Sequence, residues 1–94
     1  FKIGEIRLDS KKHEVTVHGE VVNLTLKEYE LLKRLMKNSN IVLTRDQLLE
    51  DIWGYDFDGE TRTVDVHVRT LRQKLGDAGE QIETVRGVGY RMSR

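Results

Sequence analysis

The side chains best suited to molecular recognition lie in one stretch, residues 62–75. Arginine and threonine recur there with one glutamine and several valines, and the candidates for contact with base edges are Val66, Arg69, Thr70 and Gln73. Arginine can pair with guanine, glutamine can pair with adenine, and an apolar side chain can contact the thymine methyl group. This combination is suited to reading the major groove of double-stranded DNA.

Apolar spacing predicts that this stretch is a helix. One buried stripe is expected at i, i+4, i+7 and i+11, made of Val64, Val68, Leu71 and Leu75. At about 100° per residue, the polar side chains then lie on the opposite face. Gly76 is placed to end the helix as a left-handed cap. An ordinary solvated amphipathic helix shows the same pattern, so the helix alone leaves both interpretations open.

Two further helices are expected before it, each opened by a capping box. Thr25 with Glu28 predicts a helix that starts at Leu26 and is ended by residues 38–40, and Thr44 with Gln47 predicts one that ends at Trp53 before Gly54. The first helix should bury its apolar positions, namely Leu26, Tyr29, Leu31, Leu32, Leu35 and Met36. The second should bury Leu48, Leu49 and Ile52.

Strand patterns are expected at both ends of the chain. Ile6 and Leu8, then Val15 and Val17, alternate as in a short antiparallel sheet with a turn at residues 19–20. Residues 82–86 and 90–93 are β-prone and are joined through 87–89, which predicts a hairpin with basic residues near its tip. Residues 41–43 suit a small strand or a packed connector. Helices followed by such a hairpin resemble a helix-turn-helix with a wing that reaches the minor groove or backbone.

Composition limits the classes of protein that remain. The chain has 94 residues, with 37% hydrophobic and 34% charged, which fits one small domain with a modest core. It has no cysteine and no long apolar run, so we expect an intracellular protein without disulfides or a membrane span. Residues 1–60 hold nine basic and twelve acidic residues, whereas 61–94 hold seven and four. The basic pole is therefore C-terminal, and the start at Phe1 suggests a piece of a longer protein.

Catalytic patterns are weak throughout. The histidines at 13, 18 and 67 lack metal-ligand spacing, and we expect His13 and His18 to face opposite sides of a strand. No serine or threonine has a convincing His and Asp constellation. Asp56, Asp58 and Glu60 alternate like oxygen ligands but lack the other positions of a calcium loop. We therefore expect no catalysis, no metal and no cofactor.

Four motifs together resemble one known family. LTLKEYELL at 24–32, LTRDQLLEDIWG at 43–54, RTVDVHVRTLRQKL at 62–75 and TVRGVGYR at 84–91 closely resemble the DNA-binding effector domain of OmpR/PhoB response regulators. The resemblance covers essentially the whole chain, 1–94. It implies an α+β winged helix-turn-helix with an N-terminal four-stranded antiparallel sheet, three helices and a C-terminal β-hairpin wing. It also implies a cytoplasmic two-component transcription factor that binds specific DNA sequences.

The resemblance implies a role for each matching residue. Backbone contacts are implied for Trp53, Arg62, Thr63, His67, Arg72 and Lys74, and wing contacts for Thr84 and Arg86. Alternatives remain open, because Trp53 and His67 could serve packing, and Arg72 could pair with Asp65 within the domain. Thr70 departs from family members that read a base there with arginine, which leaves the target sequence open.

Partners are implied by the same resemblance. A phosphorylatable receiver domain, absent from this chain, would precede the effector domain, and dimers would bind direct repeats at promoters. The loop at 54–61 would contact RNA polymerase through Tyr55, Asp56, Phe57, Asp58 and Glu60, although an acidic loop could also be simply solvated. The competing interpretation is a winged-helix protein-interaction module. Val66 and Gln73 among arginines suit groove edges better than an acidic protein patch.

Overall fold

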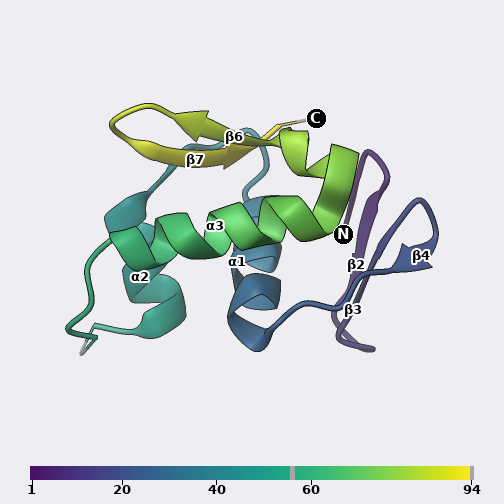
Figure 1. Cartoon of the computed structure of the whole chain (residues 1–94), viewed down its shortest axis with the longest axis horizontal. Helices are drawn as coiled ribbons and strands as arrows, with labels where there is room; N and C mark the ends of the chain where they lie inside the picture. The colour runs from purple at the N-terminus through teal and green to yellow at the C-terminus, as the bar shows by residue number, and fades with distance from the viewer. Residues whose placement is uncertain (56, 94) are drawn as a thin grey trace.

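The structure is a computed structural model that describes residues 1–55 and 57–93 (Figure 1). An N-terminal four-stranded sheet stands at one end, and three helices with a second small sheet form the rest of the domain. Helix α3 lies across α1 and α2, with the strands β6 and β7 along its other side (Figure 1). The structure confirms the predicted winged-helix architecture.

The N-terminal sheet is antiparallel in the order β1-β2-β3-β4, with β1 at Lys2–Ile3, β2 at Ile6–Asp9, β3 at Glu14–Val17 and β4 at Glu20–Val21. The predicted alternation is confirmed, because Ile6, Leu8 and Val15 are buried while Val17 packs against the core. The placement of His13 and His18 on a strand was wrong. Both histidines have positive φ and stand in the turns that flank β3.

Helices α1, at Leu26–Lys37, and α2, at Arg45–Trp53, begin where the capping boxes predict. The Thr25 N–H donates to the Glu28 carboxylate at 2.8 Å, and the Thr44 N–H donates to Gln47 at 2.8 Å. Leu26 corrects one expectation: it is 58% exposed, because the first residue of α1 is left uncovered by the core.

Helix α3 spans Arg62–Leu75 and buries its predicted apolar stripe. The four stripe residues, Val64, Val68, Leu71 and Leu75, are each at most 2% exposed. Gly76 ends the helix with φ of 63° and ψ of −134°, which is outside the left-handed helical region. The expected left-handed cap was therefore wrong, because the chain continues into a 3₁₀ segment, η1, at Gly76–Gln81 that the sequence patterns did not indicate.

The wing belongs to a three-stranded sheet ordered β5-β7-β6, with β5 at Leu43–Thr44, β6 at Ile82–Val85 and β7 at Gly89–Met92. The hairpin is confirmed, but its loop is 86–88 rather than 87–89. Gly89 pairs with Val85 and also with Thr44. A Cβ atom at Gly89 would lie 2.0 Å from the Leu43 carbonyl oxygen, so this close strand approach requires glycine.

Substitution of Gly89 should therefore separate β5 from β7. We expect Gly89→Ala to lower the free energy of unfolding by about 1–3 kcal/mol, because the added methyl group overpacks a strand contact. Urea unfolding followed by circular dichroism measures this change. Val88→Ala in the exposed loop should change stability by less than about 0.5 kcal/mol. Equal stabilities for the two variants would contradict the close approach.

No helix in the part of the chain that the structure describes is long and apolar enough to cross a membrane.

Candidate nucleic-acid interface

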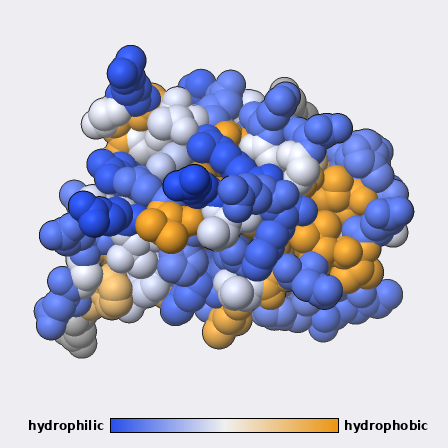
Figure 2. All heavy atoms as spheres, viewed as in Figure 1, coloured by the Kyte–Doolittle hydropathy of each residue, from blue (hydrophilic) through white to orange (hydrophobic). Residues whose placement is uncertain are grey.

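One row of side chains on α3 faces solvent along the length of the helix. This exposed row consists of Arg62, Val66, Arg69 and Gln73, spaced i, i+4, i+7 and i+11. Val66 is 51% exposed although it is apolar. Mostly hydrophilic side chains cover this face of the molecule (Figure 2). The row offers two guanidinium groups, one amide and one apolar contact to an elongated groove.

A second row on α3 runs along the boundary with α1 and α2. This inner row consists of Thr63, His67, Thr70 and Lys74, one helical position after the exposed row. The His67 ring meets the Trp53 ring edge-on, with 4.8 Å between centroids. The His67 Nδ1 atom lies 2.8 Å from the Thr63 carbonyl oxygen. Because a carbonyl only accepts, Nδ1 carries the hydrogen, and Nε2 is the nitrogen left for a partner.

The other two members of the inner row bind Glu28 of α1. The Thr70 hydroxyl donates to Glu28 Oε2 at 2.6 Å, and Lys74 Nζ donates to Oε1 at 2.6 Å. Glu28 is only 3% exposed. Burial by itself would raise the pKa of Glu28, but the hydrogen bonds from Lys74, Thr70 and Thr25 outweigh burial and lower the pKa from 4.5 to about 2. The carboxylate is therefore charged at neutral pH.

The opposite edge of α3 is held against the wing. Asp65 accepts hydrogen bonds from Arg45, whose Nε lies 3.0 Å away, and from the Tyr90 hydroxyl at 2.7 Å. Burial and the hydrogen bond to Asp65 raise the pKa of Tyr90 to about 12, so its hydroxyl remains a donor. One carboxylate thus joins the first residue of α2 and strand β7 to α3.

Arg72 holds the wing directly. Its guanidinium donates to the Ile82 carbonyl through Nε at 3.0 Å and Nη2 at 2.6 Å, and Nη2 also donates to Thr84 at 2.8 Å. It also lies 5.6 Å from the Tyr90 ring centroid. The possible ion pair between Arg72 and Asp65 was wrong, because Arg45 occupies that carboxylate.

Two further groups of predicted residues lie beyond α3. Arg86 is exposed in the wing loop. In the segment between α2 and α3, Tyr55 is 84% exposed and Phe57 is 38% exposed, and Asp58 and Glu60 also face solvent. Asp56, which the resemblance also assigns to this segment, lies outside the described residues.

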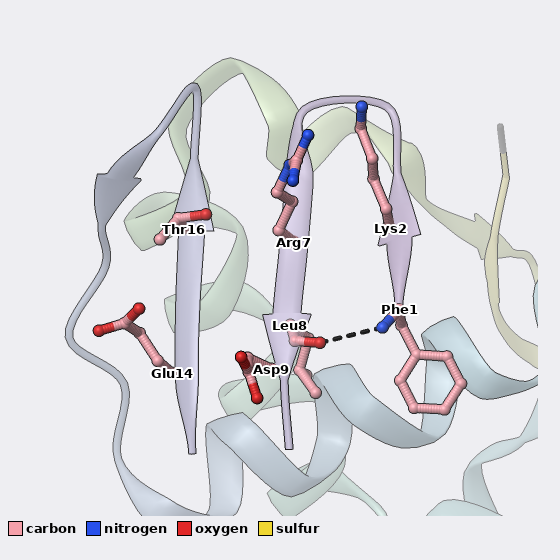
Figure 3. Close-up of a pocket in the computed structure, with 7 residues that line it drawn as sticks. All are labelled: Phe1, Lys2, Arg7, Leu8, Asp9, Glu14 and Thr16. Atoms are coloured by element: carbon pink, nitrogen blue, oxygen red, sulfur yellow. Dashed lines mark hydrogen bonds between the residues drawn. The ribbon is translucent and has the colours of Figure 1, made fainter. Parts of the chain in front are cut away.

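A separate polar hollow lies on the outer face of the N-terminal sheet (Figure 3). Lys2 and Arg7 are cross-strand neighbours at one end, and Asp9 and Glu14 are neighbours at the other. The Phe1 backbone nitrogen donates to the Leu8 carbonyl oxygen at 3.0 Å beside them. Within residues 1–55 and 57–93, no three histidine or carboxylate side chains cluster closely enough to hold a metal ion.

A helix-turn-helix with a polar exposed row on its third helix and an adjoining β-hairpin defines a winged-helix DNA-binding domain. The chain belongs to the family described as "Transcriptional regulatory protein, C terminal", whose model matches residues 19–92. This domain is the DNA-binding effector part of OmpR/PhoB-type response regulators and is not an enzyme. The resemblance found in the four sequence motifs is confirmed.

Curated relatives agree with this assignment. The chain is 47% identical over 95 residues to the sensory transduction protein RegX3 of Mycolicibacterium smegmatis, covering 98% of this chain and 42% of the relative. It is 51% identical over 87 residues to the response regulator ArlR of Staphylococcus saprophyticus, covering 90% and 40%. The chain therefore spans about two fifths of the length of these relatives.

Solved structures show the same fold. The DNA-binding domain of the response regulator AdeR, in complex with an intercistronic region, has a TM-score of 0.88 and 35% identity, covering 100% of this chain and 99% of that one. The Klebsiella pneumoniae RstA DNA-binding domain, in complex with the RstA box, has a TM-score of 0.87 and 33% identity, covering 99% and 95%.

The contact between Glu28 and α3 is the feature that sequence patterns missed. Glu28 was predicted only as the third residue of α1, where it completes the capping box with Thr25, a local role that it fulfils. Its second role joins it to Thr70 and Lys74, more than forty positions away. In the sequence, this contact was signalled only by a glutamate at the start of a helix face that is otherwise apolar.

The depressed pKa of Glu28 predicts how acid affects stability. A group whose folded pKa lies below its ordinary 4.5 contributes stability that is present above about pH 4.5 and is lost as pH falls toward 2. We expect the free energy of unfolding to fall over this range more steeply in the parent chain than in Glu28→Gln. Urea titrations at several pH values measure both slopes. Parallel curves would contradict a charged, hydrogen-bonded Glu28.

Proposed function

We propose that this chain reads a specific DNA sequence by placing the exposed row of α3 in the major groove. The observation that carries the proposal is the exposure of Val66 between Arg62, Arg69 and Gln73, since this apolar side chain is 51% exposed and lies outside the hydrophobic core of the described residues. Its fold relatives AdeR and RstA were solved with DNA, which supports the same activity for this chain.

The role of each side chain in the interface follows from whether its polar groups are already hydrogen-bonded within the domain. Three side chains contact base edges, namely Val66, Arg69 and Gln73. Four others contact the DNA backbone, namely Trp53, Arg62, Thr63 and His67. From the wing, Arg86 contacts the minor groove or the backbone. Four other predicted residues, Thr70, Arg72, Lys74 and Thr84, are hydrogen-bonded within the domain. We propose that these four residues hold the DNA-contacting residues in position.

Selection from random duplex DNA, read out by sequencing, tests the proposal. The chain should enrich a short motif at moderate salt, and fusion to an artificial dimeriser should enrich two copies about one helical turn apart. No enrichment with or without the dimeriser would contradict the proposal and favour a protein-interaction module.

Substitutions at two arginines of the exposed row should have different effects. We expect Arg69→Ala to relax preference at one or two base pairs and to cost about 1–3 kcal/mol on the selected site. Arg62→Ala is the matched control, because loss of a phosphate contact weakens every sequence alike and lowers the salt slope by about one unit. Binding measured on selected and scrambled duplexes separates the two. An equal loss on both duplexes for Arg69→Ala would contradict its base-reading role.

We propose that this domain works within a longer regulator. The curated relatives are more than twice as long as the matched segment, which supports the preceding receiver domain that the family resemblance implies. We extend the proposal to a cytoplasmic location and to dimers on direct promoter repeats. We also propose that the 54–61 segment contacts RNA polymerase, because Tyr55 and Phe57 present apolar surface beside the exposed carboxylates of Asp58 and Glu60.

If the 54–61 segment contacts polymerase, substitutions there should affect polymerase recruitment without affecting DNA binding. We expect Tyr55→Ala combined with Asp58→Asn to keep the affinity for the selected duplex and to lose most recruitment of purified polymerase to that duplex. A mobility-shift assay with and without polymerase measures both properties. Unchanged recruitment would show that the segment is merely solvated.

A further inference from the structure

We propose that Glu28 is a positioning residue that keeps Lys74 and Thr70 off the DNA and so limits backbone contact to the exposed row and the wing. The inference rests on the proposed function, since it describes which α3 side chains remain available to DNA. A residue of α1 thereby influences how many DNA phosphates the domain neutralises.

The two possible partners of Lys74, Glu28 and a DNA phosphate, lie in different environments. Glu28 is 3% exposed and accepts three hydrogen bonds, from the Thr25 N–H, the Thr70 hydroxyl and the Lys74 ammonium. If Lys74 turned to a phosphate, it would leave a buried carboxylate without its countercharge, which is costly. A phosphate at a solvated groove edge offers Lys74 a weaker, screened pairing. The intramolecular pair is therefore retained.

Lys74 is placed on α3 where a free lysine could contact DNA. It lies one position after Gln73 of the exposed row, and its side chain is 38% exposed. Without Glu28, an ammonium on a flexible stem at this position would reach the backbone that flanks the groove. Thr70 likewise follows Arg69 directly, but its hydroxyl proton is given to Glu28 and is not free for a base acceptor.

Glutamine at position 28 isolates the charge from the other roles of Glu28. Its amide oxygen can still accept from the Thr25 N–H, and its amide nitrogen can donate to the Thr70 hydroxyl oxygen. The capping box also tolerates glutamine, since Gln47 completes the equivalent box at Thr44. The ion pair with Lys74 is lost and the hydrogen bond with Thr70 reverses, which frees the Thr70 hydroxyl proton. Glu28→Gln should therefore release both side chains while α1 stays capped.

The experiment measures the dependence of affinity on salt for a selected and a scrambled duplex. We expect Glu28→Gln to tighten binding to both duplexes at low salt and to steepen the slope of log K against log salt by about one unit. Lys74→Gln alone should leave the slope of the parent chain unchanged, because this lysine is already occupied. The double substitution Glu28→Gln with Lys74→Gln should return the slope to that of the parent chain.

Glu30→Gln is the matched control. It makes the same charge change on the same helix, but Glu30 lines the groove between α1 and α2 with Lys33 and Arg34. We expect it to leave the slope unchanged, which separates release of Lys74 from a change in net charge.

Three results would overturn the inference. A slope that Glu28→Gln does not steepen would overturn it while leaving the proposed function intact. A slope that is flatter than that of the parent chain by about one unit, in Lys74→Gln or in the double substitution that leaves no unpaired buried charge, would show that Lys74 already neutralises a phosphate. If the parent chain binds neither duplex, the proposed function fails and the inference fails with it.

Discussion

Burial of one apolar stripe on α3 is the constraint on which the rest of this structure depends. Val64, Val68, Leu71 and Leu75 are almost completely excluded from solvent and face the core that α1, α2 and the N-terminal sheet help to build. Because side chains on a helix are fixed at about 100° intervals, the buried stripe determines which row faces outward. The same hydrophobic burial that stabilises the domain thus presents the exposed row.

Two buried or half-buried carboxylates then fix the rotation of α3 about that stripe. Glu28 joins one edge of α3 to α1, and Asp65 joins the other edge to α2 and the wing strand β7. Arg72 adds a direct link from α3 to β6. Removal of one partner from such pairs leaves an uncompensated charge, so each pair resists displacement of the helix. The exposed row is consequently held at a set angle to the wing.

Local signals predicted most of the fold, and tertiary contacts account for the errors. The capping boxes at Thr25 and Thr44 and the stripe on α3 are encoded within a few residues, and all three were confirmed. The exposure of Leu26 depends on what lies across from it, which a helical pattern does not contain. The partner of Arg72 and the second role of Glu28 involve residues distant in sequence, so residue types alone left them open or unseen.

The most direct test of this account is a crystal structure of the chain on a duplex obtained by selection. We expect α3 to enter the major groove with Val66, Arg69 and Gln73 against base edges, while Lys74 remains within hydrogen-bond distance of Glu28. A complex in which α3 faces away from the groove, or in which Lys74 and Thr70 leave Glu28 to contact the DNA, would contradict it.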